Sequence, residues 1–152
     1  MSKVYTSFNE VSRAYNKVRM ELWHLGVLWD GSKLDSVACI LDSIPLECII
    51  RKVAGLWKKE KNAIVFPRFY LAGGKKDSNV DVFRHEFGHA LADLYPGALK
   101  KGGLFRAAFG GAYGEDSAEE CVAGGVTGYV SEYATSATQE DFAETFMLFV
   151  KH

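Results

Sequence analysis

The sequence predicts an α+β fold, with three amphipathic helices around a short strand–turn–strand unit. Helices are predicted at 8–25, 78–95 and 139–150, because apolar residues recur there at spacings of three and four. Two apolar runs within 53–66 flank a Lys-rich segment, which is typical of a β-hairpin. The chain of 152 residues is expected to form one minimal domain spanning 1–152.

The composition is ordinary for a globular protein and argues against two classes of partner. Hydrophobic residues make up 48% of the chain and charged residues 24%, which excludes a disordered or fibrous protein. The 18 basic and 19 acidic residues leave a net charge of -1, so bulk charge attracts neither nucleic acid nor an anionic membrane. We see no apolar signal segment and no run of about 18 apolar residues, so we expect no membrane span and a cytoplasmic location in the producing cell. Secretion by a specialised route stays open, as does release from a longer precursor.

Capping signals delimit the first helix. Ser7 and Glu10 have the spacing of a capping box, in which the side chain of each residue accepts a hydrogen bond from the backbone N–H of the other. Gly26 is expected to end the helix. Residues 27–50 are ambiguous, because their apolar run fits either a short helix or a buried strand before Pro45 interrupts it.

Two strands are predicted at 53–57 and 63–66, separated by the polar turn 58–62. The glycines and lysines of 71–76 then predict a flexible loop. This loop leads into the second amphipathic helix.

The two later helices have recognisable ends. The helix at 78–95 stops at Pro96, because proline lacks the N–H that would continue the helical hydrogen bonds. The glycine-rich stretch 97–130 predicts loops with one short helix at 116–122. Thr138 is the expected N-cap of the last helix.

His85-Glu86-Phe87-Gly88-His89 is an HExxH sequence within a predicted helix. Residues four apart stand on one helical face, so His85 and His89 can bind one metal ion. Glu86 lies beside them, within reach of a water on that ion. Zinc hydrolases use this arrangement as two ligands and a general base. The alternative is a chance match on a surface helix.

A catalytic zinc site needs a third protein ligand. In this sequence, carboxylates are the remaining candidates for that ligand. His24 and His152 are the other histidines, and neither has motif context. The sixth residue after the motif is Tyr95 rather than a third histidine, which excludes the HExxHxxGxxH pattern. Glu140 and Glu144 lie four residues apart, on one face of the last predicted helix.

Two explanations of this acidic pair stay open. Carboxylates on a Phe-rich, inward-packing helix are costly to bury unless they meet a cation, and a metal ion would supply one. Acidic side chains are also favoured near an exposed helix N-terminus, where the helix dipole is positive. Spacing alone does not rank Glu140 above Glu144 as a ligand.

The sequence HEFGHAL at 85–91, followed by Tyr-x6-Glu-x-Phe-Ala-Glu at 133–144, resembles the gluzincin-type zinc metallopeptidases related to anthrax lethal factor and the Pro-Pro endopeptidases. The likeness covers 80–95 and 129–150, with both parts in the expected order. It implies a compact zincin domain, with a small twisted sheet, an active-site helix and a C-terminal helix that brings the third ligand.

The resemblance also assigns roles outside the HExxH sequence. It implies that Glu140 is the third zinc ligand and that Tyr133 assists catalysis. Glu144 would bind a ligand histidine by a hydrogen bond and fix its tautomer. Relatives often carry Asp three residues after the second histidine, where this chain has Ala92. We therefore expect the supporting contacts to be built differently, with Asp93 as the candidate.

These residues predict a zinc-dependent endopeptidase that acts on a peptide or protein substrate. His85, His89 and Glu140 would hold Zn2+, and Glu86 would take a proton from the attacking water and deliver it to the leaving amine. Tyr133 would stabilise the oxyanion. Two alternatives stay open: a zincin-fold module that binds metal or a protein partner without hydrolysis, and an effector or toxin peptidase with one dedicated target.

Two structural expectations accompany this function. Strand 63–66 would be the sheet edge on which an extended peptide pairs main chain to main chain. Gly88, inside the motif, would let a neighbouring segment approach the helix closely.

Overall fold

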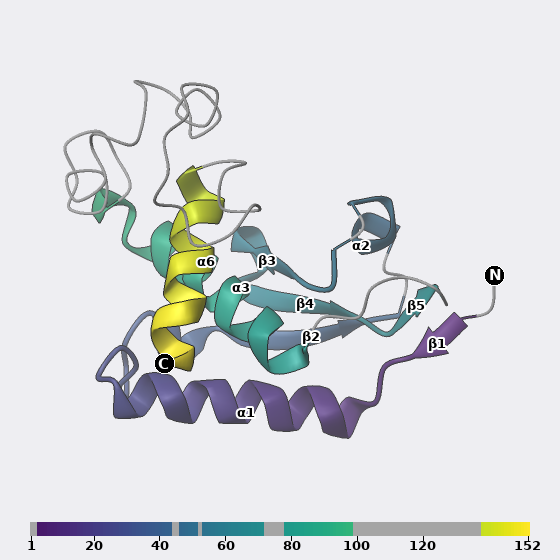
Figure 1. Cartoon of the computed structure of the whole chain (residues 1–152), viewed down its shortest axis with the longest axis horizontal. Helices are drawn as coiled ribbons and strands as arrows, with labels where there is room; N and C mark the ends of the chain where they lie inside the picture. Colours follow the sequence, from purple (N-terminus) through teal and green to yellow (C-terminus); the bar gives the residue numbers. More distant parts are fainter. Residues whose placement is uncertain (1–2, 44–45, 52, 72–77, 99–137) are drawn as a thin grey trace.

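The computed structural model describes residues 3–43, 46–51, 53–71, 78–98 and 138–152 (Figure 1). It has a mixed α+β structure, which confirms the predicted class. The described α-helices are α1 (Phe8–His24), α2 (Leu46–Arg51), α3 (Asn79–Leu94) and α6 (Thr138–Lys151). The described strands are β1 (Lys3–Tyr5), β2 (Ala38–Asp42), β3 (Leu56–Lys58), β4 (Ala63–Pro67) and β5 (Phe69–Leu71). Single 3-10 turns are η1 (Leu34–Ser36), η2 (Lys59–Lys61) and η3 (Pro96–Ala98).

Three predictions concern residues outside this description: most of the loop at 71–76, the short helix at 116–122, and Tyr133. The last helix begins one residue earlier than predicted. Thr138, the expected N-cap, is instead the first helical residue of α6.

The first helix has the ends that the sequence predicts. Ser7 caps α1 by accepting a hydrogen bond from the backbone N–H of Glu10, with 3.5 Å between nitrogen and hydroxyl oxygen. Beyond the helix, Gly26 has a φ of 72°, a left-handed conformation that glycine adopts without steric cost. The buried face of α1 consists of Val11, Ala14, Val18 and Leu22.

The longest described helix is α1, with 17 residues. Within the described ranges, no helix combines the length and the apolar character that crossing a membrane requires.

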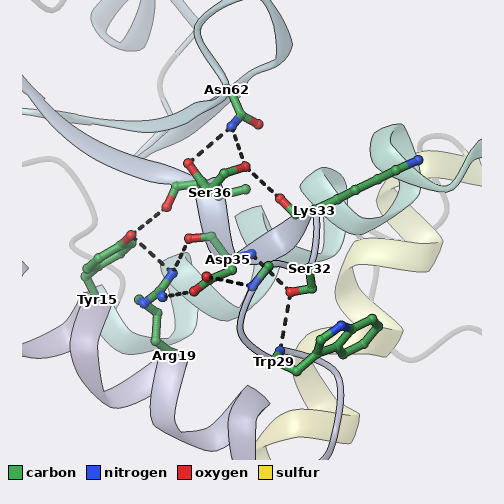
Figure 2. A network of polar contacts seen from close by, with 10 residues as sticks. Tyr15, Arg19, Trp29, Ser32, Lys33, Asp35, Ser36 and Asn62 are labelled. Atoms are coloured by element: carbon green, nitrogen blue, oxygen red, sulfur yellow. Dashed lines mark hydrogen bonds and ion pairs between the residues drawn. The ribbon is translucent and has the colours of Figure 1, made fainter.

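Polar side chains tie α1 to the η1 turn (Figure 2). The Arg19 guanidinium donates to the Asp35 carboxylate at 2.6 Å and to the Asp35 carbonyl at 3.1 Å. The Tyr15 hydroxyl donates to the carbonyl of Val37 at 2.5 Å. These bonds fix α1 relative to the start of β2.

Before Pro45, the apolar run of residues 27–50 forms the strand β2 rather than a short α-helix, and the five residues of β2 are exposed or half-buried. The strand β2 pairs in parallel with β4, Ala38 lying opposite Ala63. The short helix α2 follows it and buries Cys48. The helix α2 begins after Pro45, so it lies beyond the apolar run whose assignment was open.

The central strand of the three-stranded sheet is β4, in the order β2-β4-β3. It pairs antiparallel with β3, which confirms the predicted strand–turn–strand unit, although β3 begins at Leu56 rather than at residue 53. The prediction that 63–66 forms the sheet edge is wrong. All five residues of Ala63–Pro67 are buried, and an unbroken apolar run is the pattern of a strand covered on both faces. Separately, β1 pairs antiparallel with β5, a two-stranded unit that the sequence did not reveal.

The helix α3 is the element against which the other parts pack, since it contacts α1, α6, β3 and β4 (Figure 1). Phe83 and Phe87 are fully buried. The Phe83 ring stacks on Phe66 of β4, with ring centroids 4.4 Å apart. These apolar contacts hold the helix that carries the HExxH sequence against the sheet.

The crossing of α3 and α6 depends on Gly88. A Cβ atom on Gly88 would lie 3.0 Å from the Ala143 Cα and 3.2 Å from the Phe146 ring. The expected close approach of a neighbouring segment is therefore confirmed, and that segment is α6.

An ion-pair network joins α1, α3 and α6. The buried Arg84 donates to the Glu21 carboxylate at 2.7 and 2.9 Å and to the Asp81 carboxylate at 2.7 Å. Lys151 of α6 reaches Asp81 at 3.2 Å. Arg84 precedes His85 in the sequence, so the network fixes α3 directly beside the HExxH histidines.

Candidate metal centre

The helix α3 places His85 and His89 one turn apart on one face, as predicted. Their ring centroids are 4.8 Å apart, and their Nε2 atoms are separated by 3.1 Å. Glu86 belongs to the same group, in which one potential ligand atom from each of the three residues lies within 4.8 Å of the others. One turn of α3 thus supplies three side chains that can hold a metal ion.

The first turn of α6 brings Glu140 to these histidines. A Glu140 oxygen lies 3.1 Å from the His85 Nε2, and the two Glu140 oxygens lie 3.1 and 3.3 Å from the His89 Nε2. The predicted convergence of the two distant helices is therefore present. It follows from the close crossing of α3 and α6.

The spacing of these donor atoms fits a bound transition metal. Zinc bonds of about 2.0–2.2 Å place neighbouring donors of a tetrahedral site roughly 3.3–3.6 Å apart. The observed separations among His85, His89 and Glu140 are 3.1 to 3.3 Å, only slightly shorter. Imidazole and carboxylate donors suit several divalent transition metals, so the ligand set fits a metal without selecting zinc.

Carboxylates raise the affinity of His85 for positive charge. Burial opposes the charged imidazole, but hydrogen bonds with Glu140 and Glu144 outweigh burial and raise the pKa of His85 to about 10. Burial likewise disfavours the charged form of Glu140, but the two histidines lower the pKa of its carboxyl well below the ordinary value. Binding of a metal ion here would displace a proton from His85.

Glu144 and Glu140 contact different parts of the site. The Glu144 carboxylate lies 2.9 Å from the His85 Nδ1, on the side of the ring away from Glu140. This contact places the proton of a neutral His85 on Nδ1 and leaves the Nε2 lone pair directed at His89 and Glu140. The expected hydrogen bond of Glu144 to a histidine is therefore present, and geometry now separates the two acids that spacing could not rank.

Glu86 is buried beside the histidines and is held by the main chain of β3. The Trp57 backbone N–H donates to the Glu86 Oε2 at 2.9 Å. Burial raises the pKa of the Glu86 carboxyl, while the nearby His89 and His85 and the Trp57 N–H oppose that rise. Such a carboxylate is suited to accept a proton at neutral pH.

Asp93 is connected to the site through Trp57. The Trp57 indole Nε1–H donates to the Asp93 Oδ2 at 2.5 Å. Sequence reasoning gave Trp57 no role, because no chemical motif distinguishes it from other apolar strand residues. Only the topology reveals this contact, because β3 is an edge strand next to α3 and its main chain offers a hydrogen-bond donor.

The remaining candidates lie elsewhere. His24 ends α1 and is exposed, and His152 is the last residue of the chain. Neither belongs to the metal-holding group found among the described residues. Tyr133 lies outside them, so its assignment stays a prediction.

Comparisons of this chain with protein-family models, with curated proteins and with solved structures found no match. A proposal of function therefore has to rest on the geometry of His85, Glu86, His89 and Glu140.

Proposed function

We propose that this chain is a zinc-dependent endopeptidase with a gluzincin-type zincin domain. The observation that carries the proposal is the meeting of the His85 Nε2, the His89 Nε2 and the Glu140 carboxylate, with Glu86 beside them. The sequence resemblance points to the same four residues in the same roles.

Four side chains would bind the metal ion or orient its ligands. His85, His89 and Glu140 would hold the ion, and Glu144 would keep the His85 ring in the tautomer that binds it. Zinc, when bound there, lowers the pKa of water toward about 7 and polarises a substrate carbonyl.

Glu86 would move the proton. One of its oxygens, Oε2, is fixed by the Trp57 N–H, which leaves Oε1 to accept a proton from the attacking water. The same carboxyl then delivers this proton to the nitrogen of the departing amine. Its raised pKa favours both transfers near neutral pH, because a much stronger acid would hold the proton too weakly. Tyr133 would stabilise the oxyanion, by resemblance.

The strand that an extended peptide would join is β3 rather than β4. In the described part of the chain β3 has one strand neighbour, β4, and it lies against α3. Main-chain groups of a strand residue point to the same side in antiparallel pairing, so the Trp57 carbonyl faces outward with its N–H. A substrate strand would pair with this outer side of β3 through the Trp57 carbonyl, because the Trp57 N–H is bonded to Glu86.

Metal analysis combined with peptide cleavage tests the proposal. Protein from metal-replete expression should carry one zinc per chain, and His89→Gln and Glu140→Gln should lose it. Glu86→Gln should keep zinc but lose cleavage of a proteome-derived peptide library by about 100-fold or more, as expected for loss of a general base.

The matched control is Glu60→Gln, an exposed acid on the η2 turn, which should behave as the unchanged protein. Absence of stoichiometric zinc overturns the proposal at its first step. Zinc binding without any Glu86-dependent cleavage overturns the peptidase and leaves a metal-binding module.

A further inference from the structure

We propose that Trp57 and Asp93 are a positioning pair that fixes the Glu86 carboxylate for proton transfer, with Asp93 acting through Trp57. This inference rests on the proposed function, because Glu86 must be the general base for its orientation to matter.

Trp57 is attached to α3 at two points. Its backbone N–H donates to the Glu86 Oε2 at 2.9 Å, and its indole N–H donates to the Asp93 Oδ2 at 2.5 Å. Glu86 and Asp93 are seven residues apart, about two helical turns, and therefore share one face of α3. A single residue of β3 thus spans two successive turns of the active helix.

The strand β3 needs such an attachment. It has only three residues, Leu56–Lys58, and in the described chain it pairs with one strand. Short edge strands are weakly held by main-chain pairing alone. The hydrogen bond from the indole to the Asp93 carboxylate involves a charged acceptor, so it is among the stronger side-chain contacts available.

The position of Trp57 determines the direction of Glu86. The Glu86 side chain is buried, 7% exposed, and its Oε2 receives the N–H of an edge strand. If the indole is released, β3 can shift along α3, and the N–H no longer fixes the rotation of the carboxyl group. Proton transfer depends on that rotation because the acceptor lone pair must face the water.

Near the end of α3, Asp93 is the residue that reaches Trp57. Ala92 is buried and carries no polar group, whereas Asp93 projects toward Trp57. Support of the site therefore divides into two parts: Glu144 orients a histidine, and Asp93 orients the base through β3.

Kinetics of the zinc-loaded enzyme on the best-cleaved peptide of the proteome-derived library form the first arm of the test. Trp57→Phe and Asp93→Ala should each lower kcat by about 10–100-fold, the range for contacts one layer behind a catalytic group, with KM and zinc content nearly unchanged. Asp93→Asn should restore most of the rate, since its amide oxygen still accepts the indole N–H. Combining Trp57→Phe with Asp93→Ala should cause no further loss, because both changes break one connection.

Controls are chosen by residue type. Trp29→Phe changes a tryptophan residue that is 53% exposed, and Asp30→Ala removes an exposed acid away from Trp57. Both should keep the full rate.

Nuclear magnetic resonance of the metal-free protein forms the second arm, which is independent of catalysis. The Trp57 amide should exchange with solvent faster in Asp93→Ala and in Glu86→Ala than in the unchanged protein, and Asp93→Asn should restore its protection. Unchanged exchange in Asp93→Ala, or losses of kcat and zinc content together, overturn the positioning pair. If the unchanged protein cleaves nothing while Trp57 exchange responds as described, the proposed function fails and the attachment of Trp57 stands.

Discussion

At the scale of single residues, His85 is the most constrained group of the site. Its Nδ1 faces Glu144 and its Nε2 faces His89 and Glu140. A neutral ring can donate from only one of these nitrogens, so the environment favours a positive charge on or beside the ring. The charge can be a proton or a metal ion, and the two compete.

This competition predicts opposite pH dependences for the metal-free and zinc-loaded protein. The folded pKa of His85 is raised from 6.5 to about 10, so its contribution to the stability of the metal-free fold is complete below 6.5 and declines as pH rises toward 10. Glu140 has a lowered pKa, so its contribution is present above 4.5 and is lost only in stronger acid. Zinc binding releases the His85 proton and therefore strengthens with pH.

Thermal unfolding of both forms between about pH 6 and pH 9 measures this effect. The difference in Tm between zinc-loaded and metal-free protein should widen as pH increases. A Tm difference that stays constant or narrows over this range would contradict competition between a proton and zinc for His85.

At the scale of elements, the crossing of α3 and α6 decides whether the site exists. Both helices were predictable, because their apolar spacing and the proline after α3 are local signals. Their contact was predictable only in part: Gly88 indicated a close neighbour, but nothing local named α6. The partner was named by the family resemblance, which joined Glu140 to the histidines.

Gly88→Ala tests the crossing directly. The new Cβ would lie 3.0 Å from the Ala143 backbone, so α6 must move outward. We expect a loss of about 1–3 kcal/mol in the free energy of unfolding, typical of overpacking, together with weaker zinc binding because Glu140 retreats. Urea unfolding and zinc titration measure the two effects.

Gly97→Ala is the matched control, since a Cβ there meets nothing within 4 Å. It should leave both zinc affinity and stability nearly unchanged. Equal behaviour of the two variants would mean that the Gly88 contact does not hold Glu140 in place.

The prediction that β4 forms the sheet edge was wrong because it required knowledge of how the strands are ordered. An apolar run of four or five residues indicates burial, but it does not reveal how many strands pair with it. The parallel partner β2 came from the ambiguous region 27–50, so the sequence offered no second strand to place beside β4. The role of Trp57 was missed for the same reason, because it depends on which strand is the edge.

At the scale of the whole molecule, the fold packs α1, the sheet and the C-terminal helix α6 around α3. The helix α1 and the sheet hold α3 from two sides, through Arg84 and through Phe83, and α6 closes over the remaining side (Figure 1). A metal bound between α3 and α6 therefore links the C-terminal helix to the core, so zinc binding and folding should reinforce each other.

X-ray absorption at the zinc edge of the loaded protein tests the central claim most directly. We expect only nitrogen and oxygen neighbours at about 2.0–2.2 Å, with two imidazoles contributing, and loss of this bound-zinc spectrum in Glu140→Gln. Sulfur neighbours at about 2.3 Å, or a spectrum unchanged by Glu140→Gln, would show that zinc binds elsewhere and would contradict it.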